Sequence, residues 1–340
     1  MLLTTVAVTA LAVETPAGTL NPVPSRDRKV VRRWELPGDP RGLAIGADGT
    51  IYVGLAEPQA VVAIDPETGA VKKRIVLDSA EIASTKELVT LRTNPQRTRL
   101  YVANGSDESA TILSLPDLGV LREITKEGET IRDVVPDPKG RYVYLLGRRV
   151  HVYDADGRSE LRTLDVTDPM ALAVSADALA VFATEDFGNT KATVVTMYDA
   201  KNFARITKDP LQTTKTIEGA LFSAKDRTLI ALSRDSIFHR NAIPAKGPRG
   251  NIINSRLACF PENSGPQIAT LTTDDTLVYA ERRCSASGAF TSSTSGITPA
   301  SLYGVDAYAI TYDAKSNTII ATDRTGFLTI YHVPRVVISE

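Results

Sequence analysis

Five residues of this chain have side chains that commonly bind ligands, and they occupy equivalent positions in a repeated sequence: Arg41, Arg132, Glu218, Gln267 and Tyr308. An arginine guanidinium presents a flat fork of N–H groups that matches a carboxylate or a phosphate. Arg41 and Arg132 therefore predict a binding site for a small anion. The alternative is that both arginines pair internally, with Glu218 or with neighbours such as Asp133.

The three histidines and one acidic turn do not predict a metal site. His151, His239 and His332 lie far apart in the sequence, without the short spacing of paired metal ligands. We expect them on third strands of the repeated units, as half-buried strand residues. The sequence DADG at residues 154–157 begins like a calcium-binding loop but lacks the later ligands, and a hairpin turn explains it.

Motifs for covalent chemistry or for cofactor binding are absent from the sequence. There is no Cys-x-x-Cys-His for haem attachment, no Gly-x-Ser-x-Gly nucleophile turn and no glycine-rich phosphate loop. We therefore predict neither a catalytic residue nor a bound cofactor.

The elements that position these residues follow from an internal repeat. The sequence IYVG at residues 51–54, followed by VVAIDPETG at 61–69, returns as LYVA at 100–103, followed by TILSLPDLG at 111–119. One apolar residue of the second strand recurs in each unit, at Ile51, Leu100, Val143, Val181, Leu229, Leu277 and Ile319. The spacing of about 38 to 49 residues fits four short antiparallel strands and three turns. The sequence thus predicts an all-β, seven-bladed propeller of four-stranded antiparallel blades.

The last unit supplies three good strands between residues 308 and 333, and we expect its fourth strand to come from the N-terminus, at residues 29–36. Such a strand closes the ring and leaves no unpaired edge. Counting back from each second strand then places the five ligand-binding candidates at the entrances of inner strands, around an axial channel.

These units resemble the YVTN family of β-propeller repeats, most closely at residues 51–54 and 100–104, and the resemblance covers most of residues 36–335. It implies a seven-bladed ring outside the cytoplasm with a binding or surface role. Similar rings include lactonases and the heavy subunits of quinoprotein amine dehydrogenases. A lactonase-like enzyme, or a heavy subunit of a quinoprotein-like complex, therefore remains an alternative function.

Two segments in units five and six break the repeat, at residues 244–250 and 285–296. The second is rich in Ser, Thr and Gly, and it is either an irregular loop or a recognition loop on a rigid ring. The two cysteines, Cys259 and Cys284, flank the first two strands of unit six on one face. We predict a disulfide between them, worth about 3 kcal/mol in the chain-entropy description, with two free thiols as the alternative.

The N-terminal residues and the domain bounds can also be predicted from the sequence. Residues 1–12 carry no charge and end in small residues, which predicts a secretory signal or an apolar N-terminal arm. Residues 13–28 are expected to be a linker, and residues 29–340 a single propeller domain. The apolar run is too short to span a membrane, which needs about 20 residues.

A net charge of −1 argues against a nucleic-acid partner. We accordingly expect a periplasmic or extracellular, non-catalytic binding or scaffold protein with a protein or small-ligand partner. It would not span the membrane, and it is a candidate subunit of a larger assembly.

Overall fold

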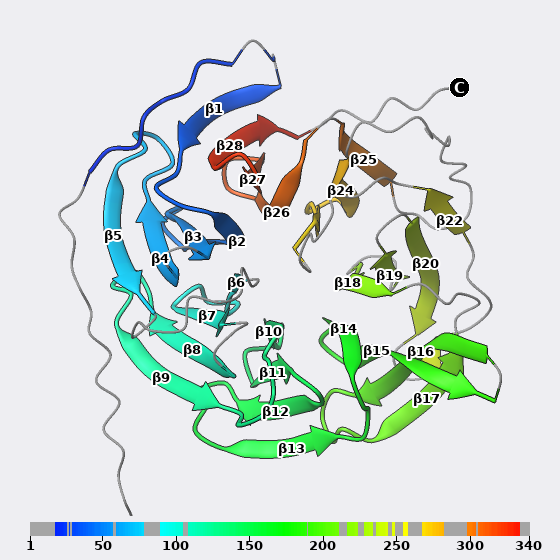
Figure 1. Ribbon diagram of the computed structural model, residues 1–340. Coiled ribbons are helices and arrows are strands. Elements are labelled where there is room, and N and C mark those ends of the chain that lie inside the picture. The colour runs from blue at the N-terminus through cyan, green and yellow to red at the C-terminus, as the bar shows by residue number, and fades with distance from the viewer. Residues whose placement is uncertain are drawn as a thin grey trace, which may run out of the picture.

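The computed structural model describes the chain outside residues 1–17, 26, 28, 57–58, 78–88, 105–107, 189, 211–215, 224–227, 234–235, 244–246, 249–253, 258–266, 282–297, 304 and 334–340. Every regular element in the described part is a β-strand, and the strands form seven sheets set around a central axis (Figure 1). The predicted all-β, seven-bladed propeller is confirmed. Cys259, Cys284 and the predicted signal or arm lie outside the described residues, so the disulfide stays a prediction.

Blades 1 to 4 each contain four antiparallel strands in chain order, with the first strand nearest the axis (Figure 1). Blade 1 consists of β2 (Pro40–Ile45), β3 (Ile51–Ala56), β4 (Gln59–Ile64) and β5 (Val71–Val76). Blade 2 consists of β6 (Val89–Thr93), β7 (Arg99–Asn104), β8 (Ser109–Ser114) and β9 (Val120–Thr125). Blade 3 consists of β10 (Asp133–Pro136), β11 (Tyr142–Leu146), β12 (Val150–Asp154) and β13 (Glu160–Leu164). Blade 4 consists of β14 (Pro169–Val174), β15 (Ala178–Phe187), β16 (Thr190–Asp199) and β17 (Arg205–Pro210).

Blades 5 and 6 depart from the predicted four antiparallel strands. Blade 5 consists of β18 (Ile217–Phe222), β19 (Thr228–Ser233) and β20 (Ser236–Ile243), and β20 pairs with both β21 (Gly247–Pro248) and β22 (Asn254–Leu257). Blade 6 consists, in the described part, of β23 (Ala269–Leu271), β24 (Thr276–Glu281) and β25 (Thr298–Tyr303). β25 runs parallel to β24. Parallel neighbours need a connection of about a dozen residues or more, and residues 282–297 of the sequence separate these two strands.

Blade 7 is built from both ends of the chain, as predicted. β26 (Ala307–Asp313), β27 (Thr318–Asp323) and β28 (Phe327–His332) supply its inner three strands, and β1 (Val30–Glu35) supplies the outermost. β1 pairs antiparallel with β28. The ring therefore closes by hydrogen bonds between the first and the last strands (Figure 1).

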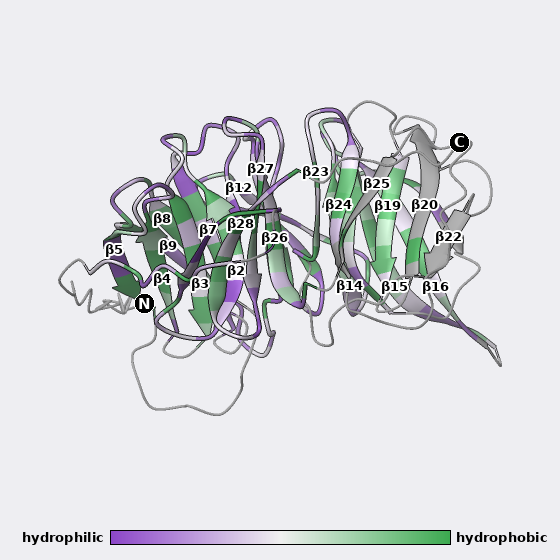
Figure 2. Ribbon diagram, turned by 90° about the horizontal axis from the view of Figure 1, so that it is seen from above, coloured by the Kyte–Doolittle hydropathy of each residue, from purple (hydrophilic) through white to green (hydrophobic). Residues whose placement is uncertain are grey.

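The hydrophobic core lies between neighbouring blades, along the middle of the strands. All seven apolar residues of the repeat are buried on second strands, with at most 2% of their surface exposed: Ile51, Leu100, Val143, Val181, Leu229, Leu277 and Ile319. Figure 2 shows hydrophobic residues concentrated along the strands and hydrophilic residues at the turns of the two faces. Each blade thus buries both faces of its sheet against its neighbours, as a ring requires.

Residues 18–23, which fall in the predicted linker, hydrogen-bond to both sides of the joint between blades 7 and 1. The Leu20 amide donates to the Gly69 carbonyl in blade 1, and the Val23 amide donates to the Arg33 carbonyl in β1. Trp34 of β1 is buried at this joint, against the turn that contains Gly69. We call this contact region, formed by residues 18–23, Trp34 and Gly69, the closing seam.

Candidate functional site

Four inner strands contain a β-bulge near their first residue, at equivalent places. The bulged residues are Arg41, Met170, Glu218 and Tyr308, each skipped in the pairing with the second strand of its blade. A bulge adds one residue to a strand and re-aims its side chain. Arg41, Glu218 and Tyr308 thus occupy the equivalent positions inferred from the sequence.

The inner strands begin on one face of the ring, and the turns between second and third strands lie on that same face. Two backbone hydrogen bonds show this, from the Ala56 amide to the Asp39 carbonyl and from the Arg324 amide to the Asp306 carbonyl. We call it the entrance face.

Arg41, Tyr308 and Arg324 come together on the entrance face where blades 1 and 7 meet. The guanidinium carbon of Arg41 lies 4.0 Å from the centre of the Tyr308 ring, and that of Arg324 lies 4.9 Å from the same centre. Asp39 accepts a 2.7 Å hydrogen bond from Nη2 of Arg41, and Asp306 lies 3.5 Å from Nε of Arg324. These five residues form what we call the arginine–tyrosine cluster.

Several N–H groups of this cluster have no hydrogen-bond acceptor among the described residues. They are Nε of Arg41 and both Nε and Nη2 of Arg324, and all three are shielded from water. A buried donor without an acceptor costs about 1–3 kcal/mol. Nε of Arg41 and Nη2 of Arg324 therefore have unused capacity for an acceptor such as a carboxylate, whereas Nε of Arg324 already faces Oδ1 of Asp306.

A third arginine, Arg33 of β1, packs against the turn between β27 and β28, which contains Arg324. The guanidinium of Arg33 packs 3.8 Å from the centre of the Phe327 ring, and its Nη2 lies 3.4 Å from Asp323. Arg33 and Arg324 were not found from the sequence. They could have been found from the strand order of a propeller blade, because the turn between β27 and β28 must lie beside the start of β26.

Arg132 and Glu218 lie apart from this cluster. Arg132 is exposed just before β10, and its Nη2 donates to the carbonyls of Gly147 (3.2 Å) and Pro169. Glu218 is half-buried at the start of β18. Of the five candidates, the structure therefore joins Arg41 to Tyr308 but gives Arg132 backbone partners of its own.

Gln267, at the entrance of blade 6, uses its side-chain amide to connect other blades. Its Oε1 accepts hydrogen bonds from the amides of Leu43 (3.2 Å) and Leu91 (3.3 Å), and its Nε2 donates to the carbonyls of the same two residues at 2.8 Å. Its backbone carbonyl accepts from Ile310. Two acceptor and two donor positions are the full capacity of an amide, so none remains for a ligand.

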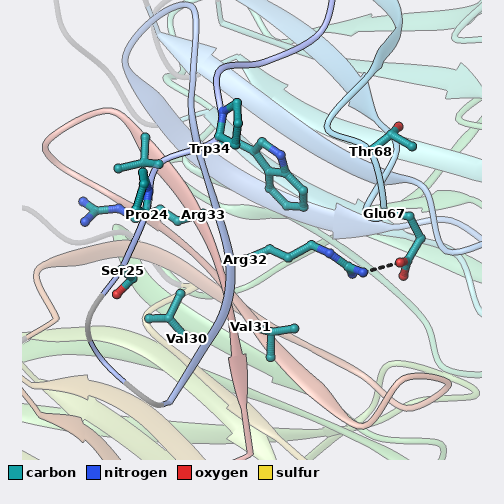
Figure 3. A pocket seen from close by; sticks show the side chains of 11 residues that line it. Pro24, Ser25, Val30, Val31, Arg32, Arg33, Trp34, Glu67 and Thr68 are labelled. Carbon is teal, nitrogen blue, oxygen red and sulfur yellow. Dashed lines mark hydrogen bonds and ion pairs between the residues drawn. The ribbon is translucent and has the colours of Figure 1, made fainter.

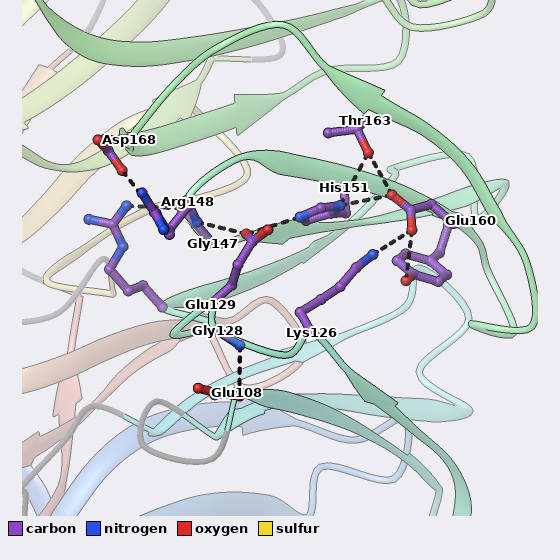
Figure 4. A network of polar contacts seen from close by, with 12 residues as sticks. Glu108, Lys126, Gly128, Glu129, Gly147, Arg148, His151, Glu160, Thr163 and Asp168 are labelled. Atoms are coloured by element: carbon purple, nitrogen blue, oxygen red, sulfur yellow. Dashed lines mark hydrogen bonds and ion pairs between the residues drawn. The ribbon is translucent and has the colours of Figure 1, made fainter.

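His151 forms the centre of a polar network between blades 2 and 3 (Figure 4). Its Nδ1 lies 2.8 Å from Oε1 of Glu160, and its Nε2 lies 3.1 Å from Oε2 of Glu129. Lys126 pairs with the second oxygen of Glu160. Because both ring nitrogens face carboxylates, which only accept, the imidazolium form satisfies both contacts.

The network changes the proton affinity of its carboxylates. Burial alone would raise the pKa of Glu160, but hydrogen bonds from Lys126, Thr163 and His151 outweigh burial and hold this pKa at about 2. Burial would also raise the pKa of Glu129, yet His151 lowers it below its usual value. Both glutamates are therefore ionised at neutral pH.

A cavity of about 460 Å³ lies beside the closing seam, between residues 22–25, β1 and the turn at Glu67 and Thr68 (Figure 3). An ion pair between Arg32 and Glu67 crosses one side of it. This cavity contains none of the five predicted candidates.

Within the described residues, no group of three or more His, Cys, Asp or Glu side chains is placed to hold a metal ion. His151, His239 and His332 lie on third strands, as expected. The expectation that they are half-buried is wrong for the two whose burial is described, because His151 is buried and His332 is exposed. The described part also contains no helix that is long and apolar enough to cross a membrane.

Comparison with known proteins establishes the fold. No protein-family model and no curated protein match this sequence. Among solved structures, the chain is similar to a WD40-type propeller chain from the crystal structure of a mitotic checkpoint complex, with 14% sequence identity and a TM-score of 0.65. The similarity covers 96% of this chain and 99% of that one. At this identity the likeness shows a propeller, and it does not show membership of the YVTN family.

Proposed function

We propose that this protein is a non-catalytic binding or scaffold protein that engages a protein partner through its entrance face. The observation that carries the proposal is the arginine–tyrosine cluster, in which Arg41 and Arg324 pack on Tyr308 and retain N–H groups without acceptors among the described residues. Arginine and tyrosine are enriched among the residues that dominate binding energy at protein interfaces. The propeller chain to which this chain is similar belongs to a protein complex, which agrees with this role.

The proposal includes the setting expected from the sequence. A YVTN-type ring outside the cytoplasm, free or as a subunit of a larger assembly, would present the entrance face to a partner. An uncharged N-terminal stretch with small residues at its end supports export.

Affinity purification from the native cells, with quantitative mass spectrometry, tests the function. Tagged wild-type protein is compared with Arg324→Glu, which reverses a charge on the entrance face, and with Arg122→Glu, which makes the same change on the exposed outer strand β9. We expect one stoichiometric partner to be recovered with wild type and with Arg122→Glu and to be lost with Arg324→Glu. Equal recovery with all three proteins would contradict use of this face.

A further inference from the structure

Arg41 and Arg324 pack against a ring through the faces of their guanidinium groups, which leaves the edges for hydrogen bonds. A guanidinium carries five N–H donors in one plane, and packing on an aromatic ring occupies none of them. Among the described residues, Arg41 has one side-chain hydrogen bond, to Asp39, and Arg324 has an ion pair with Asp306 but no side-chain hydrogen bond. Most donors of both arginines thus remain unused within the described part of the chain.

The cluster is also accessible from one side. The Arg41 side chain is only 6% exposed, whereas the Arg324 side chain is 25% exposed and that of Asp306 is 45% exposed. A ligand that approaches the entrance face would therefore meet Arg324 before the buried Arg41.

The charges of the cluster discriminate between anions. Arg41 and Arg324 contribute two positive charges, and Asp39 and Asp306 contribute two negative charges. A phosphate near neutral pH adds up to two further negative charges beside the two aspartates, whereas a carboxylate adds one. The flanking aspartates therefore favour a carboxylate, whose two oxygens also match the fork of one arginine.

We propose that Arg41 and Arg324, held on Tyr308, bind a single carboxylate group of the partner protein. The inference rests on the proposed function and names the chemistry of the same site. In it, the partly exposed Arg324 side chain contacts the carboxylate first and turns its shielded Nε and Nη2 groups toward it. Arg41 supplies a fixed second donor, because Asp39 and the Tyr308 ring hold it in place.

Nuclear magnetic resonance of arginine-labelled protein tests the carboxylate site. The Nε–H signals are recorded while one of three peptides is added: Ac-Gly-Glu-Gly-NH₂, acetyl-triglycine with a free C-terminus, or the neutral Ac-Gly-Gln-Gly-NH₂. Inorganic phosphate at matched ionic strength is a fourth probe. We expect saturable shifts of the Arg41 and Arg324 signals with a carboxylate peptide, smaller shifts with phosphate and none with the neutral peptide. The Glu and C-terminal peptides separate a side-chain carboxylate from a chain terminus.

Variants assign the signals and test the geometry. Arg324→Lys keeps the charge but removes the fork, and we expect it to weaken binding of the better peptide about tenfold. Arg148→Lys, at a side chain that is 71% exposed in blade 3, should leave binding unchanged. Absence of saturable shifts, equal shifts with the neutral peptide, or full binding by Arg324→Lys would each overturn the inference.

The two proposals fail in different ways. If carboxylate peptides bind but partner recovery does not depend on Arg324, the carboxylate site stands and its use for the partner is wrong. If partner recovery depends on Arg324 but no carboxylate peptide binds, the binding face stands and the carboxylate inference is wrong.

Discussion

The side-chain amide of Gln267 is a structural connection between blades rather than a free polar group. From the entrance of blade 6 it hydrogen-bonds both backbone groups of Leu43 in blade 1 and of Leu91 in blade 2. The position was foreseen from the repeat, but this role was not. It depends on which backbone lies across the axis, and no local pattern in the sequence encodes that.

Replacement of Gln267 should therefore destabilise the whole ring. Gln267→Leu leaves two buried amides and two buried carbonyls without partners, and we expect the free energy of unfolding to fall by about 3–5 kcal/mol. Urea unfolding measures this loss of free energy. Gln59→Leu, at a half-buried site at the start of β4, is the control and should cost less than about 1 kcal/mol. A loss at Gln267 no greater than at Gln59 would contradict the bridging role.

His151 should matter far more than the other histidine whose side chain is described. His151→Leu leaves Glu129 and Glu160 facing an apolar side chain, and we expect a loss of about 2–4 kcal/mol in unfolding free energy. His332 is exposed and also lies on a third strand, so His332→Leu is a matched control with little expected effect. Chemical unfolding of both variants at neutral pH makes the comparison, and similar losses would argue against the network.

Glu160 should make stability depend on pH in the acid range. Its folded pKa of about 2 lies below the usual value near 4.5, so its stabilising effect is complete above about pH 5 and disappears as pH falls toward 2. The effect is about 2 kcal/mol after allowance for partial solvent screening. Thermal stability from pH 6 to pH 2 should fall less steeply for Glu160→Gln than for wild type. Parallel curves would exclude this carboxylate as the cause.

At the level of strands and turns, the closing seam depends on a glycine. Gly69 has φ of +71°, and a Cβ atom there would lie 2.6 Å from Cδ1 of Trp34. Gly49 also has a positive φ, of +90°, but a Cβ atom there would meet nothing within 4 Å. Substitution of Gly49 therefore measures the cost of the backbone conformation alone, whereas substitution of Gly69 adds the cost of displacing Trp34.

We expect Gly69→Ala to lower the free energy of unfolding by about 2–4 kcal/mol and Gly49→Ala by about 1 kcal/mol. Denaturant titrations followed by the fluorescence of Trp34, the single tryptophan, report both stability and the seam. If both variants lose the same amount, contact between the turn and Trp34 contributes nothing.

The strands were predictable where local patterns govern them. The apolar residue of each second strand is buried in all seven blades, and the N-terminal strand pairs where expected. Blades 5 and 6 were less predictable, because their outer strands are set by pairing across long connections instead of by tight turns. The parallel pairing of β25 with β24 is the clearest example.

At the scale of the whole molecule, the ring is held shut by residues from opposite ends of the sequence. Pairing between β1 and β28 is a contact of very high sequence separation, and such contacts slow folding. The sequence predicted this closure because blade 7 lacked a fourth strand. It did not predict the added hydrogen bonds of residues 18–23, since that segment has no strand pattern.

A circular permutant tests the cost of closure. A chain that begins at Gly38 and carries residues 18–37 on a flexible linker after its C-terminus makes blade 7 contiguous. We expect similar equilibrium stability and faster refolding, measured by stopped-flow fluorescence of Trp34. The same permutant with Trp34→Phe, followed by circular dichroism, checks that the faster phase does not depend on the probe. An unchanged refolding rate would show that closure does not limit folding.

The position of the arginine–tyrosine cluster has a consequence for when it can exist. Arg41 belongs to blade 1, whereas Tyr308 and Arg324 belong to blade 7, which is complete only when β1 has paired with β28. A nascent chain therefore cannot display the cluster before residues 327–332 have been synthesised and paired. A partner that recognises the cluster would bind only the closed ring, so the bound partner would oppose opening of the ring. Binding would also distinguish the completely folded protein from an incomplete or open chain.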